Sequence, residues 1–205
     1  MSERAPLARG PVGIEGPVEV RFGWATSSVR STAALRIADR TPLAKVLVRA
    51  PSDGQVAARL GVSHGSAQRD EHGTLVVSSG PGDWLLFGPP GSAAELIGRI
   101  DVQDDGLVSV LDYTHGRALM RLTGAAAAQS LAKLCPINLA DRVTPDHAAF
   151  RSSVAQVATD VVRDDVDGVT SYLLHCERSS GQHLFEAITD AGGEFGLELD
   201  GFAYP

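Results

Sequence analysis

The sequence has few cysteines and no concentration of positive charge. Its two cysteines, Cys135 and Cys176, form no C-x-x-C pair, so neither a disulfide framework nor a paired-cysteine zinc site is indicated. Buried, reduced thiols are expected, which agrees with a cytoplasmic location. The 205 residues carry a formal net charge of -7 without a basic stripe. Such a chain repels a phosphate backbone, so we expect no nucleic-acid binding.

Long apolar runs are also missing. No segment approaches the roughly 18 apolar residues that a membrane-spanning helix needs, so no membrane partner is expected. Residues 1–16 contain Arg4 and Arg9 but no apolar stretch, and they do not resemble a signal peptide. With 43% hydrophobic and 21% charged residues, the composition is that of an ordinary globular protein with a core.

Several motifs of catalysis and cofactor binding are absent. The sequence has no G-x-G-x-x-G dinucleotide fingerprint and no G-x-x-x-x-G-K-[ST] phosphate loop. Its six histidines are far apart, without an H-x-x-x-H or H-E-x-x-H pair. We therefore predict no catalytic residues, no metal site and no cofactor bound by this chain.

Strand signals predominate from about residue 43 onward. Short β-branched or alternating segments predict strands at 45–49, 74–78, 84–87, 107–112, 117–122, within 150–163 and at 169–176. The dipeptides His115-Gly116 and Asp167-Gly168 predict hairpin turns.

Four helices are expected among these strands, at 52–61, 92–100, 124–134 and about 180–192. Ser52 with Gln55, and Ser92 with Glu95, have the spacing of capping boxes. The order of strands and helices predicts the α+β class, with antiparallel sheets that carry helices on one face. Two split β-α-β units in tandem would fit this order.

The N-terminal segment differs in composition from the rest. Residues 1–24 are rich in glycine and proline, so we expect a flexible arm. Residues 25–205 are expected to form one domain of two halves that meet near residue 104. The arm ends in Phe22 and Trp24, two aromatic side chains that we predict to anchor an interface with a partner.

Charged residues on the predicted strands and loops have competing interpretations. Arg117 and Arg121 share one strand face, which is either solvated or docks on an acidic partner surface. Asp112 ends a strand, where its carboxylate either accepts turn N–H groups or faces a ligand. The acidic pairs at 104–105 and 164–165 are predicted to be solvated loops.

Three segments carry ordered motifs: GPGDWLLFGPPG at 80–91, VLDYTHGRALMRLTGAAAAQSLAKLCPINL at 110–139, and ERSSGQHLFEAITDAGGEFGLEL at 177–199. They resemble, in order, the G-P-x-x-W-L-L, K-x-C-P and E-F-G-L segments of the gamma subunits of heterotetrameric sarcosine oxidases. The sequence departs from that family's pattern at Tyr113-Thr114, Asn138 and Ser180. The resemblance covers about residues 40–199.

The resemblance implies the fold shared by the aminomethyltransferase (T-protein) of the glycine cleavage system and the folate-binding domain of a tRNA-modifying GTPase. It implies a non-catalytic gamma subunit whose larger flavoprotein partners bind FAD, FMN, NAD and tetrahydrofolate and oxidatively demethylate sarcosine. T-proteins have a Gly-Gly-x-x-Asp-Asp-like motif, and the corresponding stretch here, residues 155–160, keeps Asp160 but neither glycine. The alternative is a stand-alone folate-binding or one-carbon-transfer protein of the aminomethyltransferase group, with Asp112 and Asp160 as folate-binding residues.

Overall fold

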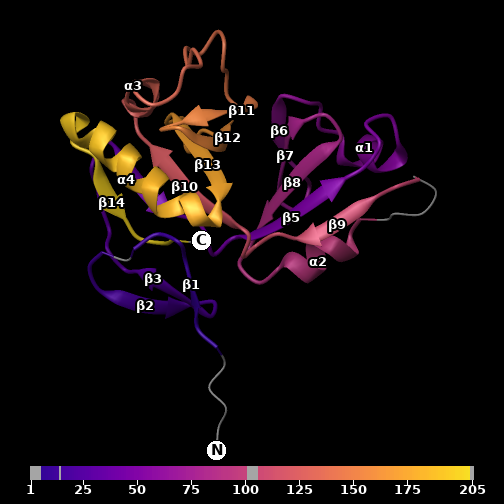
Figure 1. Cartoon of the computed structure of the whole chain (residues 1–205), viewed down its shortest axis with the longest axis horizontal. Coiled ribbons are helices and arrows are strands. Elements are labelled where there is room, and N and C mark those ends of the chain that lie inside the picture. The colour runs from indigo at the N-terminus through magenta and orange to yellow at the C-terminus, as the bar shows by residue number, and fades with distance from the viewer. Residues whose placement is uncertain (1–5, 14, 101–105, 204–205) are drawn as a thin grey trace, which may run out of the picture.

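The described part of the chain folds into two large β-sheets, a small sheet and four α-helices (Figure 1). The computed structural model describes residues 6–13, 15–100 and 106–203. The predicted meeting point of the two halves near residue 104, and the acidic pair at 104–105, lie outside these residues. Among the residues described, no helix is long and apolar enough to cross a membrane.

The first large sheet has five antiparallel strands in the order β6-β7-β8-β5-β9. Its elements are β5 (Ala44–Arg49), α1 (Gln55–Leu60), β6 (Ser66–Arg69), β7 (Leu75–Gly80), β8 (Asp83–Gly88), α2 (Ala93–Gly98) and β9 (Ser109–Asp112). Val46, Val48 and Leu86 on one face of this sheet pack in a buried cluster with Val56 of α1 and Leu96 of α2. Alternation along the strands therefore places the two helices on that face.

The second large sheet has six strands in the order β11-β12-β13-β10-β4-β14. Its elements are β4 (Arg36–Asp39), β10 (Arg117–Thr123), α3 (Ala127–Ala132), β11 (Ala149–Val154), β12 (Val157–Arg163), β13 (Ser171–Glu177), the 3-10 turn η1 (Arg178–Ser180), α4 (Gly181–Gly192), the 3-10 turn η2 (Gly193–Phe195) and β14 (Glu198–Asp200). Only the pairing of β14 with β4 is parallel within this sheet. Met120 and Leu122 of β10 pack with Leu131 of α3 and with Leu184 and Ile188 of α4.

The two large sheets repeat one plan. From β5 and from β10 the chain runs through strand, helix, three strands, helix and strand, and β4 is added to the second sheet. A third buried cluster joins the sheets, with Leu75 and Phe87 of the first sheet against Leu119, Val162 and Leu173 of the second. Figure 1 shows α3 and α4 at one side and α1 and α2 at the other. The predicted α+β class with antiparallel sheets and tandem halves is confirmed.

Some local predictions are confirmed and others are wrong. Asp167-Gly168 forms a tight turn, with φ of 52° and 75° between the paired Val166 and Val169. His115-Gly116 is not a hairpin turn, because β9 belongs to the first sheet and β10 to the second. The chain changes sheets there, a feature that short-range turn signals cannot reveal.

The predicted capping boxes are also wrong. The residue that caps α1 is Gly54, and α1 has no side-chain cap. The Ser92 hydroxyl at α2 donates to the Pro89 carbonyl oxygen at 2.8 Å instead of accepting a helical N–H. Each of these helices has only six residues, so packing on the sheet, and not capping, must stabilise it.

The N-terminal segment contributes the small sheet, with strand order β1-β3-β2. Its strands are β1 (Ala8–Arg9), β2 (Val18–Arg21) and β3 (Trp24–Ser27). The described part of the expected arm thus contains two strands that pair with β3. Trp24 and Ala25 of β3 are buried, so this end of the segment belongs to the folded body.

Candidate functional site

A pocket of about 270 Å³ lies where the facing layers of the two large sheets meet. The first sheet contributes Leu47, Arg49, Ser79, Asp83, Trp84 and Leu85, and the second contributes Arg117, Arg151, Ala158, Asp160, His175 and Glu177, with Tyr113 between them. Strand alternation explains the inward direction of these polar groups, because each occupies the face opposite the helix-covered one. We call this set the central pocket.

Asp160 on β12 is the centre of the pocket's hydrogen-bond network. Its side chain is fully buried and accepts from Ser79 Oγ at 2.6 Å, Arg117 Nη2 at 2.7 Å and Arg151 Nε at 2.8 Å. Burial would raise the pKa of this carboxyl, but interactions with His175, Ser79 and Arg151 outweigh burial and lower it below its usual value. Asp160 is therefore a carboxylate with its oxygens already occupied.

His175 on β13 lies beside this carboxylate and is buried. Burial, opposed by Asp160 and reinforced by the charge of Arg117, lowers the pKa of His175 to about 3, so the ring is neutral at physiological pH. Arg117 Nη2 lies 3.1 Å from Nδ1, and a guanidinium can only donate. Nδ1 is therefore the acceptor and Nε2 carries the hydrogen, without a hydrogen-bond partner among the described residues.

The charges of the pocket balance in pairs. Arg117 also forms an ion pair with Glu177, and its guanidinium lies 5.8 Å from the centre of the Tyr113 ring. Arg151 is more than half exposed on its outer side and forms an ion pair with Asp160. Arg49 pairs with Asp83 at 3.1 Å, so three cations face three anions among the residues that line the pocket, and the geometry is that of an ion-pair network.

Comparison with known proteins gives an evolutionary context for this pocket. No protein-family model matches the sequence. The chain is 30% identical over 142 residues to the sarcosine oxidase subunit gamma of Corynebacterium sp. strain P-1, and 31% identical over 133 residues to that of strain U-96. In structure it matches a chain of the heterotetrameric sarcosine oxidase from strain U-96, with a TM-score of 0.66, 25% identity, and coverage of 82% of this chain and 88% of that one.

The chain is a homologue of sarcosine oxidase gamma subunits. The aligned regions span 68% and 64% of this chain but 65% and 62% of the two gamma subunits, so somewhat less than two thirds of each relative is matched in sequence. The order of motifs in the sequence agrees with this similarity.

Aminomethyltransferases are related as well. That of Geobacillus thermodenitrificans is 30% identical over 123 residues, which are 60% of this chain and 33% of that protein. The structure of aminomethyltransferase T from Bartonella henselae matches with a TM-score of 0.68 at 15% identity, over 90% of this chain and 55% of that one. The predicted T-protein-like fold is confirmed by this similarity.

The structure of this gamma-subunit homologue separates the two predicted folate-binding residues. Asp160 lines the central pocket, whereas Asp112 is exposed at the end of β9 and does not line it. The Asp112 carboxylate accepts the backbone N–H of Thr114 at 2.9 Å, the turn-forming role that was one of its two interpretations. A role of either residue in folate binding stays a prediction.

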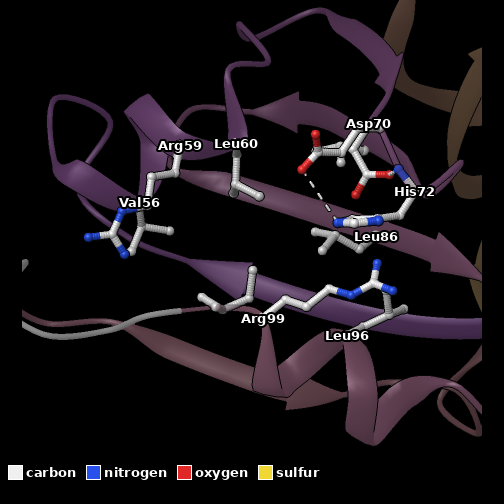
Figure 2. Close-up of a pocket in the computed structure, with 11 residues that line it drawn as sticks. Val56, Arg59, Leu60, Asp70, His72, Leu86, Leu96 and Arg99 are labelled. Atoms are coloured by element: carbon white, nitrogen blue, oxygen red, sulfur yellow. Dashed lines mark hydrogen bonds and ion pairs between the residues drawn. The ribbon is translucent and has the colours of Figure 1, made fainter.

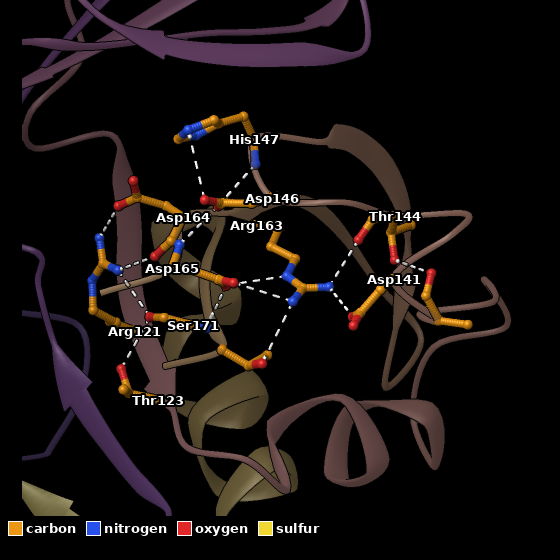
Figure 3. A network of polar contacts seen from close by, with 12 residues as sticks. Arg121, Thr123, Asp141, Thr144, Asp146, His147, Arg163, Asp164, Asp165 and Ser171 are labelled. Carbon is orange, nitrogen blue, oxygen red and sulfur yellow. Dashed lines mark hydrogen bonds and ion pairs between the residues drawn. The ribbon is translucent and has the colours of Figure 1, made fainter. Parts of the chain in front are cut away.

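The two predicted interface arginines belong to separate networks within the chain. Arg117 lines the central pocket, and Arg121 forms an ion pair with the buried Asp164 and donates to Ser171 Oγ at 2.8 Å, as Figure 3 shows. Arg69 of the first sheet reaches the same carboxylate at 2.9 Å. The prediction of a solvated loop at 164–165 is wrong, because arginines from both sheets bind Asp164. An interface role for Arg117 and Arg121 stays a prediction.

The two aromatic residues predicted to anchor an interface also differ in their surroundings. Trp24 is buried, and its ring stacks on that of His115 with centroids 4.8 Å apart. Phe22 is exposed, and its ring is nearly perpendicular to that of Phe202, with ring centroids 6.4 Å apart. Their participation in an interface stays a prediction, but only Phe22 presents a large apolar surface to solvent.

A second pocket, of about 410 Å³, lies on the helix-covered face of the first sheet. Figure 2 shows its apolar side chains, among them Leu60, Leu86 and Leu96, with Arg99 and His72 at its edge. His72 is close to the Glu71 carboxylate, and Arg99, directly after α2, forms an ion pair with Glu95 of that helix. No residue that the sequence singled out for function lines this pocket.

One sequence pattern resembles a nucleophile elbow but has the wrong structural context. Gly61 to Gly65 reads G-x-S-x-G, and the segment runs from the end of α1 to the start of β6. A nucleophile elbow needs the opposite order, from strand to helix.

Within the described ranges, no group of three or more histidine, cysteine, aspartate or glutamate side chains is placed to hold a metal ion.

The sequence did not single out Ser79, Arg151 or His175 as members of a site. Arg151 and His175 lie on β11 and β13, on either side of β12 in the second sheet, and Ser79 on β7 joins them because the two sheets face each other. The signal that could have found them is a charged or polar residue on the strand face that points into the protein. Arg151 and Asp160 are an example, because they lie opposite each other on β11 and β12.

Proposed function

We propose that this chain is the non-catalytic gamma subunit of a sarcosine oxidase-type complex in the cytoplasm. Its larger flavoprotein partner subunits would bind FAD, FMN, NAD and tetrahydrofolate and oxidatively demethylate sarcosine. The observation that carries the proposal is the match to a chain of heterotetrameric sarcosine oxidase over 88% of that chain. Homology to two gamma subunits supports it.

The chemistry of the central pocket supports a structural role for this chain. A general acid or base needs a pKa near the operating pH and a free path to the reacting proton. The pKa of Asp160 is lowered, and its carboxylate already accepts hydrogen bonds from Ser79, Arg117 and Arg151. His175 is neutral, with a pKa of about 3. Neither residue is suited to proton transfer near neutral pH.

Strand β2 offers a surface for a partner subunit. Val18, Val20 and Phe22 alternate along the chain and are 60%, 64% and 58% exposed, whereas the intervening Glu19 and Arg21 are partly buried. A strand of a monomeric protein normally turns its apolar side chains inward. β2 is also an edge strand, and an exposed apolar edge is a place for another chain to bind.

Co-expression with the flavoprotein subunits of a sarcosine oxidase tests this proposal. We expect the wild-type chain to co-purify with them. The double variant Val18→Lys/Val20→Lys should be depleted from the purified complex, although its own melting temperature stays that of the wild type. Ala58→Lys/Ala94→Lys, on exposed positions of α1 and α2, adds the same charge elsewhere and serves as the control. Absence of the wild-type chain from the purified complex would contradict the proposed function.

A second candidate function is stand-alone folate binding, which the homology to an aminomethyltransferase favours. The central pocket fits it poorly, since about 270 Å³ is below the roughly 300–1,000 Å³ of most sites for drug-sized ligands. Titration calorimetry with tetrahydrofolate decides between the two. Micromolar binding to the chain alone, lost in Asp160→Ala, would establish the second function.

A further inference from the structure

A pocket of about 410 Å³ lies over β4, β10 and β14, on the second sheet, and is separate from the central pocket. In the strand register, Arg36 is paired with Thr123, and Arg121 with Ala38, so their side chains share one face. Arg40 follows β4, and Arg69 approaches from β6 of the first sheet. Four guanidinium groups from three strands and a loop therefore line one pocket, which we call the arginine pocket.

Positive charge exceeds negative charge in the arginine pocket. Asp200 is the single carboxylate among the described residues that line it. Arg69 and Arg121 share the one carboxylate of Asp164. Among the described residues, the Arg36 side chain makes one hydrogen bond, to the Ala33 carbonyl oxygen at 3.3 Å. Four cations against Asp164 and Asp200 leave an excess of two positive charges, in a protein whose formal net charge is -7.

Arg40 shows the electrostatic cost of this arrangement. Burial, and next the charge of Arg121, lower the pKa of Arg40 to about 10, so the group stays charged at neutral pH but in an unfavourable environment. Its guanidinium binds the Ala203 carbonyl oxygen and lies 5.9 Å from the centre of the Phe202 ring. Its Nε is buried without a hydrogen-bond partner among the described residues. A bound anion would offset the repulsion between Arg40 and Arg121.

We propose that the arginine pocket binds a small anion that carries at least two negative charges on carboxylate or phosphate groups. The planar guanidinium fork matches the oxygens of both groups in pairs. Separate arginines on β4 and β10 favour a ligand with two anionic ends, and about 410 Å³ is within the usual range for a small-molecule site. This inference does not depend on the proposed function.

Titration calorimetry on the full chain tests the proposal with two probes, inorganic pyrophosphate and citrate. We expect at least one to bind, with an affinity that falls as salt rises from about 0.01 to 1 M and the screening length shrinks from about 30 to about 3 Å. Stronger binding of pyrophosphate would identify phosphate as the preferred group, and stronger binding of citrate would identify carboxylate. Each probe should also raise the melting temperature.

Variants locate the binding. Arg36→Gln and Arg40→Gln should each weaken binding about tenfold or more, because each removes a charge-assisted contact. Arg142→Gln, at an exposed position that does not line the pocket, makes the same charge change and should bind as the wild type does. If Arg40→Gln fails to fold, Arg36→Gln alone tests where the anion binds. Among the described residues the Arg36 side chain makes one hydrogen bond, so this substitution should perturb the fold little.

Two results would overturn the proposal. One is no binding of either probe at millimolar concentration and low salt. The other is wild-type affinity in Arg36→Gln. If no small anion binds but Arg36→Gln loses co-purification with a partner subunit, the pocket serves an acidic protein surface, and the small-anion proposal is wrong.

Discussion

Replacing Asp160 with asparagine would remove the anion on which the central pocket is built. The carboxylate is fully buried and binds Arg117 and Arg151, and Arg117 itself is almost fully buried. An asparagine retains the shape but leaves the Arg117 charge without its buried partner. Breaking one side of a buried ion pair costs about 3–5 kcal/mol, a large part of the roughly 5–15 kcal/mol that stabilises a domain.

The expected loss is easily measured. For a chain of this length, about 3–5 kcal/mol corresponds to a decrease of about 6–20 °C in melting temperature. The pKa of Asp160 is lowered on folding, so its contribution is present above the unfolded-state pKa and is lost as pH falls through the folded-state pKa. The difference between wild type and Asp160→Asn should therefore be constant near neutral pH and shrink in the acid range below 3.8.

Thermal and urea unfolding followed by circular dichroism provide the assay. Asp190→Asn, at an exposed position on α4, is the matched control and should change stability by less than about 0.5 kcal/mol. The double variant Asp160→Asn/Arg117→Gln should recover part of the loss, because no buried charge remains unpaired. An unchanged melting temperature in Asp160→Asn would refute the structural role, and lost activity of the complex at that unchanged stability would instead indicate a functional carboxylate.

Two further predictions concern the backbone and a buried lysine. Gly124→Ala should cost at least about 3 kcal/mol in urea unfolding, because φ is +146° and the added Cβ would collide with the Ala34 carbonyl; Gly98→Ala, where a Cβ meets open space, should be neutral or stabilising. Burial lowers the pKa of Lys45 from 10.5 to about 7. Between these two pH values Lys45 is protonated in the unfolded chain and neutral in the folded chain, so stability should rise with pH by up to about 1.4 kcal/mol per pH unit. Lys45→Met should remove this slope and the half-exposed Lys133→Met should not; an identical slope in Lys45→Met would contradict the assignment.

The repeated plan of the two sheets explains why the polar residues gather at one place. Each half covers one face of its sheet with helices and leaves the other face for its partner half. Polar residues on the facing layers, such as Ser79 and Asp160, can only meet there. The ion pairs at this meeting point join residues of the same sheet, and the hydrogen bond from Ser79 Oγ to Asp160 crosses from one half to the other.

The sequence by itself determined the elements whose formation depends on near neighbours. Strand β10 and the turn at Asp167-Gly168 were predicted because alternation and left-handed turn residues are local properties. The family resemblance was also visible, since it depends on the order of motifs such as Lys133-x-Cys135-Pro136 along the chain.

Only the tertiary structure decided which distant groups meet. Whether Asp164 is solvated or buried depends on Arg69 and Arg121, which lie 95 and 43 positions away on different sheets. The same holds for the change of sheet at His115, because no local signal states which edge the next strand will join. Sequence periodicity shows which face of a strand or helix is buried. It does not show which residue pairs with a buried charge, because electrostatic pairing depends on distance in space and not on position along the chain.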